Sequence, residues 1–149
     1  MRLEESVDKD PEAKIVELYD SARDTIWSST SLVVDFYKRS TIEKAIEDAA
    51  ARVGDFRLLI DAGVDWEQRK HQMPWLVDLA KRPNVTIRRS LHPVQHWLVV
   101  DGRHFRLEKV HPEGKIGKKN LVIWNAIKPL ADKLRDKWSE WWDDATILG

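Results

Sequence analysis

Cysteine is absent from the 149-residue chain. This excludes a disulfide framework, a thiol nucleophile and any metal site built on cysteine. The absence agrees with a reducing compartment, and we expect a cytoplasmic protein. An excess of one charge is also absent, because Lys and Arg together number 25, as do Asp and Glu. The composition gives no overall electrostatic case for nucleic acid or an anionic membrane as partner, although a local basic patch stays open.

Long hydrophobic runs are lacking as well. No apolar segment approaches the ~20 residues that cross a bilayer, and the charged N-terminal segment has no apolar core of a signal peptide. We therefore expect a soluble chain, with a membrane anchor upstream left open. The length predicts one domain with a single substantial core over residues 11–149, after a flexible leader at residues 1–10.

Helical and strand patterns alternate along the first half of the chain. Asp10-Pro11-Glu12 combines a capping residue with proline at the first helical position, which is typical of a helix start. The alternation predicts an α/β fold with a mixed β-sheet flanked by helices. Further helices are expected at 42–53, at 65–82 with a break at Pro74, and from 126 onward; strands are expected at 25–30, 56–61, 84–88, 95–108 (a hairpin) and 121–124.

Tryptophan is unusually frequent, with eight residues in the chain. Most are expected to pack in the core. Trp138, Trp141 and Trp142 fall close together in the last helix, where Trp141 and Trp142 point about 100° apart. At least one of them is therefore expected at the surface, which would favour a homodimer or another partner contact.

The hairpin at 95–108 carries the pattern from which a function can be argued. His96 stands at the entrance of its apolar first strand, which turns at Asp101-Gly102, a favoured type I′ pair. An imidazole presented at the open end of a buried strand suits phosphate chemistry, because a neutral imidazole can attack phosphorus. The alternative is a histidine that simply bonds a backbone carbonyl near the strand end.

The order of these segments resembles the phospholipase D superfamily over roughly residues 12–145. The parts that carry the resemblance are the strand 57–61, the segment Pro83-Asn84-Val85, the hairpin 96–108 and the last helix. The resemblance implies a phospholipase D-like α/β fold and a signature H-x-K-x4-D-x6-G-S-x-N. In that signature the histidine forms a phospho-histidine intermediate, and Lys, Ser and Asn hold phosphate oxygens. Members pair two such domains around one site, so a single-domain chain would need a homodimer.

Carried over residue by residue, the resemblance implies an altered catalytic set. His96 matches the histidine of the signature, whereas Leu98 stands in the place of the lysine. Asp101 follows His96 by five residues instead of seven, and the turn explains it better. The segment Gly117–Asn120 resembles G-S-x-N with lysine in place of serine but lies further downstream, and Asn125 competes for the asparagine position.

Basic residues after the hairpin are candidates for an anion site around His96. Arginine binds phosphate in a bidentate manner and lysine acts as a point charge, so such a cluster can hold a phosphate without cleaving it. The alternatives are a solvated strand face and internal pairing with Glu108. The candidate ligand-binding residues are His96, Arg106, Lys115, Lys118, Lys119 and Asn120.

Two further histidine patterns were weighed. His104-Phe105-Arg106, with His111 seven residues after His104, imitates the signature in a second register with arginine for lysine. His92 and His96 lie four residues apart, but Pro93 between them disfavours a helical metal pair. No H-E-x-x-H spacing occurs either. We therefore expect neither a metal nor a cofactor.

Three functions follow from these patterns. The favoured one is a catalytically degenerate phospholipase D-like domain with a binding or regulatory role for a phosphate-bearing ligand, such as nucleic acid, a nucleotide or a lipid headgroup. The first alternative is an active phosphodiesterase, of nuclease or phospholipase type, with His96 as its catalytic nucleophile. The second is a protein–protein interaction module.

Overall fold

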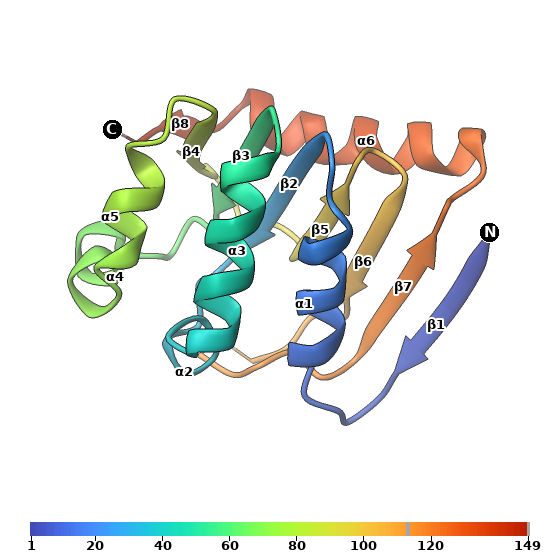
Figure 1. The fold of residues 1–149 in the computed structure, drawn as a ribbon, viewed down its shortest axis with the longest axis horizontal. Helices are drawn as coiled ribbons and strands as arrows, with labels where there is room; N and C mark the ends of the chain where they lie inside the picture. Colours follow the sequence, from blue (N-terminus) through green and yellow to red (C-terminus); the bar gives the residue numbers. More distant parts are fainter. Residues whose placement is uncertain (113, 149) are drawn as a thin grey trace.

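The computed structural model describes residues 1–112 and 114–148, and in these residues eight strands form one mixed sheet (Figure 1). In their order across the sheet, the strands are β1 (Arg2–Ser6), β7 (Asn120–Trp124), β6 (His104–Glu108), β5 (Trp97–Val100), β2 (Thr25–Thr30), β3 (Asp55–Ile60), β4 (Val85–Arg89) and β8 (Thr146–Ile147). Strands β2, β3 and β4 pair in parallel, whereas the other neighbouring strands are antiparallel. The predicted mixed sheet is confirmed.

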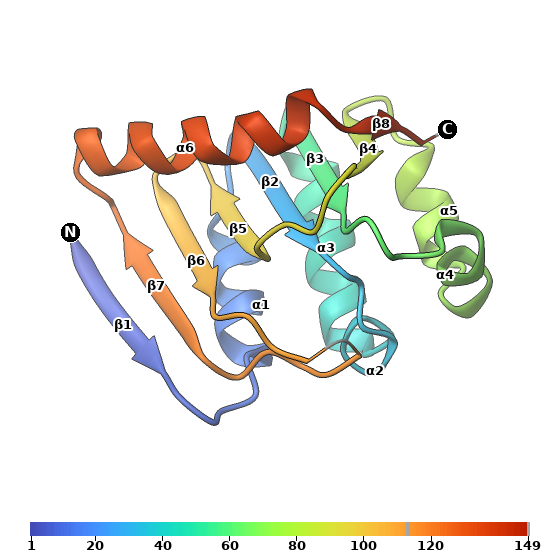
Figure 2. The same cartoon turned by 180° about the vertical axis from the view of Figure 1, so that it is seen from behind.

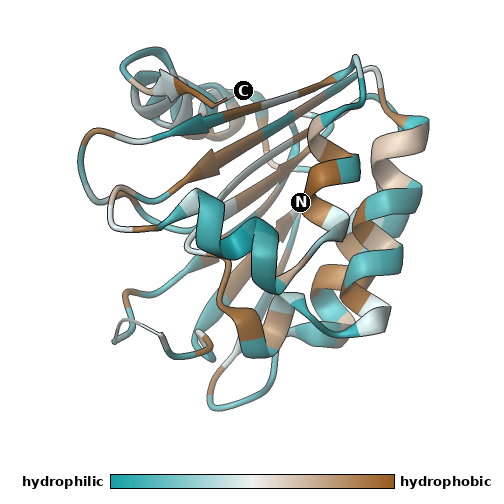
Figure 3. Ribbon diagram, turned by 90° about the vertical axis from the view of Figure 1, so that its left-hand side faces the viewer, coloured by the Kyte–Doolittle hydropathy of each residue, from teal (hydrophilic) through white to brown (hydrophobic). Residues whose placement is uncertain are grey.

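Helices cover both faces of the sheet. On one face α1 (Glu12–Ser21) lies beside α3 (Ser40–Arg52), and α2 (Val34–Tyr37), α4 (Trp66–Gln72) and α5 (Trp75–Ala80) follow beside them (Figure 1). On the other face α6 (Lys128–Asp143) crosses the strands near their ends (Figure 2). Apolar residues gather along the strands, while the helices mix hydrophilic and hydrophobic turns (Figure 3). This is the pattern of helices that bury one side against a sheet.

The structure of the N-terminal segment differs from the sequence-based prediction. The flexible leader predicted at residues 1–10 is replaced by β1, which pairs antiparallel with β7 and places Arg2 opposite Trp124. Glu4 anchors this strand, because its carboxylate accepts a hydrogen bond from Trp124 Nε1 at 2.7 Å and lies 2.7 Å from Lys14 Nζ. Charged residues are tolerated on an edge strand. Their presence therefore does not distinguish such a strand from a solvated tail.

The tryptophans of α6 face the sheet. Trp138 is fully buried between Trp27 and Trp142, with ring centroids 5.3 and 5.4 Å away. Trp141 is half-buried and meets the edge of Trp97 at 5.0 Å. These contacts explain the cluster as packing of α6 on the sheet. Trp141, the least buried of the three tryptophans among which the sequence predicts a surface residue, thus packs partly against Trp97 within the domain.

The hairpin turn is held by one carboxylate. Asp101 and Gly102 both have positive φ, at 55° and 66°, as the predicted type I′ turn requires. Asp101 accepts hydrogen bonds from the backbone N–H groups of Arg23, Asp24 and Thr25 at 2.7–3.1 Å. Burial alone would raise the pKa of the Asp101 carboxyl, but these N–H donors hold the pKa below its ordinary value. Asp101 therefore fastens the hairpin to the start of β2.

Replacing Asp101 by alanine should lower the free energy of unfolding by about 1–3 kcal/mol, because three N–H donors lose their acceptor. Asp101→Asn should lose less, since asparagine tolerates the left-handed turn and keeps one acceptor. Because the folded-state pKa is depressed, the stabilisation is complete above the ordinary carboxyl pKa of about 3.9 and disappears as pH falls through the folded value. Urea denaturation at several pH values measures this difference. Asp136→Asn, at an exposed position of α6, is the control. An equal loss of stability in that variant would contradict the role assigned to Asp101.

Candidate functional site

The chain direction of four strands brings the candidate residues to one edge of the sheet. Parallel strands β2 and β3 end at this edge, where open α/β sheets commonly bind ligands. Strand β5 runs antiparallel to β2 and therefore starts there, and β6 runs antiparallel to β5 and ends there. His96 directly precedes β5, Asp61 directly follows β3 and Glu108 is the last residue of β6. Topology alone thus places these three residues together.

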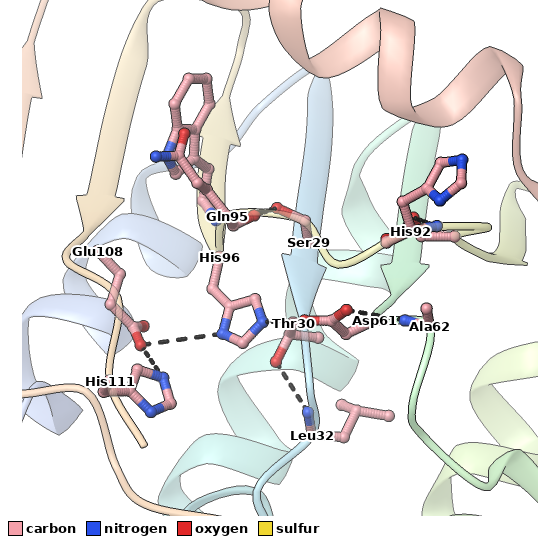
Figure 4. Close-up of polar contacts among 12 residues, drawn as sticks. Ser29, Thr30, Leu32, Asp61, Ala62, His92, Gln95, His96, Glu108 and His111 are labelled. Atoms are coloured by element: carbon pink, nitrogen blue, oxygen red, sulfur yellow. Dashed lines mark hydrogen bonds and ion pairs between the residues drawn. The ribbon is translucent and has the colours of Figure 1, made fainter. Parts of the chain in front are cut away.

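The start of β5 is fixed by Ser29 of β2. The Ser29 hydroxyl donates to the carbonyl oxygen of Gln95 at 2.7 Å and accepts from the Trp97 N–H at 2.9 Å. The Glu108 N–H donates to the carbonyl oxygen of His96 at 3.3 Å. The backbone on both sides of His96 is therefore held, and its imidazole projects into the space between Asp61 and Glu108 (Figure 4).

Carboxylates surround the imidazole of His96. Its Nε2 lies 2.7 Å from Asp61 Oδ2, and its Nδ1 lies 3.9 Å from Glu108 Oε1. Burial by itself would raise the pKa of Asp61, but the hydrogen bond with His96 and the Ala62 N–H hold that pKa below its ordinary value. Asp61 is thus a carboxylate that accepts from His96 and sets the orientation of the ring.

Glu108 is the most enclosed carboxylate of the site. Its side chain is 8% exposed, and its Oε2 lies 3.0 Å from an amino nitrogen of the buried Arg106 guanidinium. Its Oε1 contacts His111 Nε2 (Figure 4). The backbone of Gly117 packs directly on this carboxylate, because a Cβ on Gly117 would stand 1.9 Å from Glu108 Oε1. Glu108 therefore has little freedom to move.

A cavity of about 430 Å³ opens beside these side chains. His96, Asp61, Glu108 and His111 contribute to its wall, together with apolar side chains such as Val64 and Val94. A second hollow on the other side of His96 is lined by Arg106, Lys115 and Gly117 among others. The site combines an apolar pocket with a few converging polar groups, as small-ligand sites do.

The structure gathers only part of the predicted anion cluster. His96, Arg106 and Lys115 line the same hollow, and Glu108 pairs with Arg106, as the alternative of internal pairing predicted. Three predicted residues lie elsewhere: Lys118 is exposed, Lys119 and Asn120 border a different hollow over β6 and β7, and the Asn120 amide donates to the Gly117 carbonyl oxygen at 3.4 Å.

The geometry excludes the second match to the signature, which would begin at His104. His104 starts β6 at the opposite end of the sheet from Glu108, is 6% exposed and lies 5.0 Å from Trp124 between ring centroids. Its Nδ1 accepts the Asn125 N–H at 3.0 Å, and burial lowers its pKa. His104 is thus a neutral core histidine and does not reach the cavity.

Sequence reasoning underrated Asp61, Glu108 and His111. Asp61 follows a buried strand at the edge where open α/β sheets bind ligands, and this place in the sequence is a usable signal. Glu108 and His111 were considered separately, although a spacing of three residues allows two side chains to meet. Their approach to His96 depends on the pairing of β5 with β6, beyond which the Glu108 N–H bonds the carbonyl oxygen of His96, 12 residues away in the chain.

The comparisons with known proteins bear on the fold. No protein-family model matches the chain, and no curated protein sequence matches it significantly. Solved structures do match over nearly its whole length. Nuc, a phospholipase D family member from Salmonella typhimurium, gives a TM-score of 0.70 at 18% identity, over 99% of this chain and 96% of that one. NucT from Helicobacter pylori gives 0.66 at 10% identity, over 99% of both chains.

The chain has the phospholipase D fold. TrmBL2, an archaeal chromatin protein whose structure shows a novel mode of DNA binding, also matches, with a TM-score of 0.75 at 16% identity, over 99% of this chain and 55% of that one. The phospholipase D fold predicted from the sequence is therefore confirmed.

Within this phospholipase D fold, the residues of the expected signature are spread over both ends of β5. Leu98 is 4% exposed and pairs across the strands with Arg106. Asp101 lies at the far end of β5 from His96 and binds backbone N–H groups, as described above. Neither residue contributes to the cavity wall.

Gly117→Ala tests the enclosure of Glu108. The added methyl group would overlap the Glu108 carboxylate, which could move only by giving up its ion pair with Arg106, so we expect a loss of about 1–3 kcal/mol in the free energy of unfolding. Gly54→Ala is the matched control, because the nearest atom to its Cβ is 3.9 Å away. Equal stability of both variants in thermal and urea denaturation would show that the Gly117 loop moves freely.

Proposed function

We propose that this domain uses the phospholipase D fold as a binding module and does not cleave phosphodiesters. The observation that carries the proposal is the surroundings of His96, whose two ring nitrogens face the carboxylates of Asp61 and Glu108 at 2.7 and 3.9 Å. A phosphoryl-transfer site places donors and cations on the developing negative charge. Carboxylates in those places repel phosphate oxygens.

Counting along the signature supports the same conclusion. With the histidine set on His96, the lysine position falls on Leu98, which is apolar and buried. With the aspartate set on Asp101, the histidine position falls on Val94 and the lysine position on His96. In neither register are the nucleophile and its cation both present.

The ligand is expected in the cavity beside His96. Its volume of about 430 Å³ suits a small molecule or one end of a larger one. The phosphate-bearing class predicted from the sequence stays a proposal, supported by Arg106 and Lys115 in the hollow next to His96. A regulatory use is in keeping with the occurrence of this fold in an archaeal chromatin protein. A homodimer likewise stays a prediction.

Arg106 is the observation that favours an active phosphodiesterase as the second candidate. It lies opposite Leu98 on the neighbouring strand, so a cation stands beside the place of the missing lysine. Against this, the guanidinium is buried and paired with Glu108 at 3.0 Å. The Glu108 carboxylate offsets the positive charge of Arg106, which a phosphate would need.

Bis-p-nitrophenyl phosphate separates the two candidates. We expect no release of p-nitrophenolate above the buffer rate from the wild-type chain, and the same rate from His96→Ala, because the carboxylates of Asp61 and Glu108 oppose the negative charge of the transition state. Turnover by the wild type that disappears in His96→Ala, with a labelled phospho-histidine on that residue, would establish the active enzyme and overturn the binding module.

Phosphate binding is tested separately on the protein as purified. Titration with inorganic phosphate should shift the imidazole resonances of His96 and His111 and leave His71, which is exposed on α4, unchanged. Shifts confined to Lys118 and Lys119 would instead place the anion on the outer surface and contradict a phosphate ligand in the cavity.

A further inference from the structure

Each of the two histidines beside Glu108 has one ring nitrogen already engaged. His96 Nε2 lies 2.7 Å from Asp61 Oδ2, and His111 Nδ1 lies 3.0 Å from the carbonyl oxygen of Pro112. Both partners are acceptors, so neutral imidazoles that donate to them carry their hydrogens on these nitrogens. The remaining nitrogens, Nδ1 of His96 and Nε2 of His111, then carry free lone pairs.

Those lone pairs converge on Glu108 Oε1. The three atoms lie within 4.8 Å of one another, and His111 Nε2 contacts the oxygen directly. Glu108 Oε1 is fully buried and accepts no well-aligned hydrogen bond from the described residues. Three such groups in one small buried space are stabilised by positive charge, and a metal ion can pair with all three at once.

We propose that His96 Nδ1, Glu108 Oε1 and His111 Nε2 bind one divalent transition-metal ion. Two imidazoles and one carboxylate are a donor set of zinc sites that keep an open position, and imidazole also suits other ions of this series. Metal–ligand bonds of about 2.0–2.2 Å place tetrahedral donors roughly 3.3–3.6 Å apart. The separation of 3.9 Å between His96 Nδ1 and Glu108 Oε1 is close to that range. His111 Nε2 contacts Glu108 Oε1 more closely than that range, so the His111 ring would move back to admit the ion.

The groups behind the three donors match those that orient metal ligands. A carboxylate behind one histidine and a backbone carbonyl behind the other fix both rings, as Asp61 and Pro112 do here. Arg106 holds the second oxygen of Glu108 at 3.0 Å, which leaves Oε1 directed at the histidines. Every donor is thus supported from behind and faces the same point.

The ion site deepens the proposed function and rests on it, because the same cavity receives the ligand. A dication would offset the charges of Asp61 and Glu108, which otherwise oppose an anion in this cavity. Its open coordination position would face the cavity, where an oxygen of a phosphate-bearing ligand can bind. The binding module would then take its ligand through the ion.

Zinc titration of the full chain tests the site. After treatment with a chelator, the wild type should bind one Zn²⁺ per chain in competition with a chromophoric chelator. His111→Ala and His96→Ala should weaken binding at least about 100-fold, and Asp61→Asn about 10–100-fold, because it removes only the orienting group. His71→Ala, an exposed histidine on α4, should bind as the wild type does.

Spectroscopy decides whether these residues are the ligands. Co²⁺ in place of Zn²⁺ should give the visible absorption of a low-coordinate site in the wild type and in His71→Ala, but not in His111→Ala that circular dichroism shows to be folded. Failure of the wild type to bind, or an equal loss in His71→Ala, would overturn the site. That result would leave the proposed function intact, because the phosphodiester assay, repeated on chelator-treated protein, tests it without the ion. Phosphodiester hydrolysis that requires added Zn²⁺ would support the site and overturn the proposed function.

Discussion

The carboxylate of Glu108 is the constraint on which the site depends. A buried charge is costly unless paired groups compensate it, and this one is enclosed by Arg106 behind it, Gly117 above it and two imidazoles in front. Replacing Arg106 would remove the cation that is paired with this carboxylate. The end of β6 is therefore specified by electrostatics as much as by strand pairing, and the loop that follows must keep a glycine at the point of contact.

The phospholipase D fold explains why these groups meet, and the chemistry of the groups explains why the site differs from the expected catalytic set. Two parallel strands and an antiparallel hairpin bring their ends to one edge of the sheet. The fold delivers side chains from β3, β5 and β6 to this edge whatever they are. In this chain they are an aspartate, two histidines and a glutamate, so two carboxylates lie beside the imidazole of His96. Fold and function are thus separable, as in other widely used folds.

Much of the fold was predictable from local signals. Apolar runs marked β3 and β5, Asp101-Gly102 marked the turn, and Pro74 marked the break between α4 and α5, where it caps the second helix. Strand β1 was missed because charged residues on an edge strand give no apolar signal. Within the site, His96 was found from its place before a buried strand. Its partners were not, because contacts such as His96–Asp61 join residues 35 apart, and only the sheet order makes them neighbours.

Among the residues that the structure describes, both edges of the sheet are formed by strands that are short or rich in charge. On one side β1 exposes the charged side chains of Arg2 and Glu5, and on the other β8 contributes only Thr146 and Ile147. Edge strands of this kind are poor templates for another chain, since charged side chains and short length both discourage strand pairing between molecules. Growth of the sheet across copies is consequently disfavoured. A second copy of this chain would have to associate through a face of the sheet or through its helices.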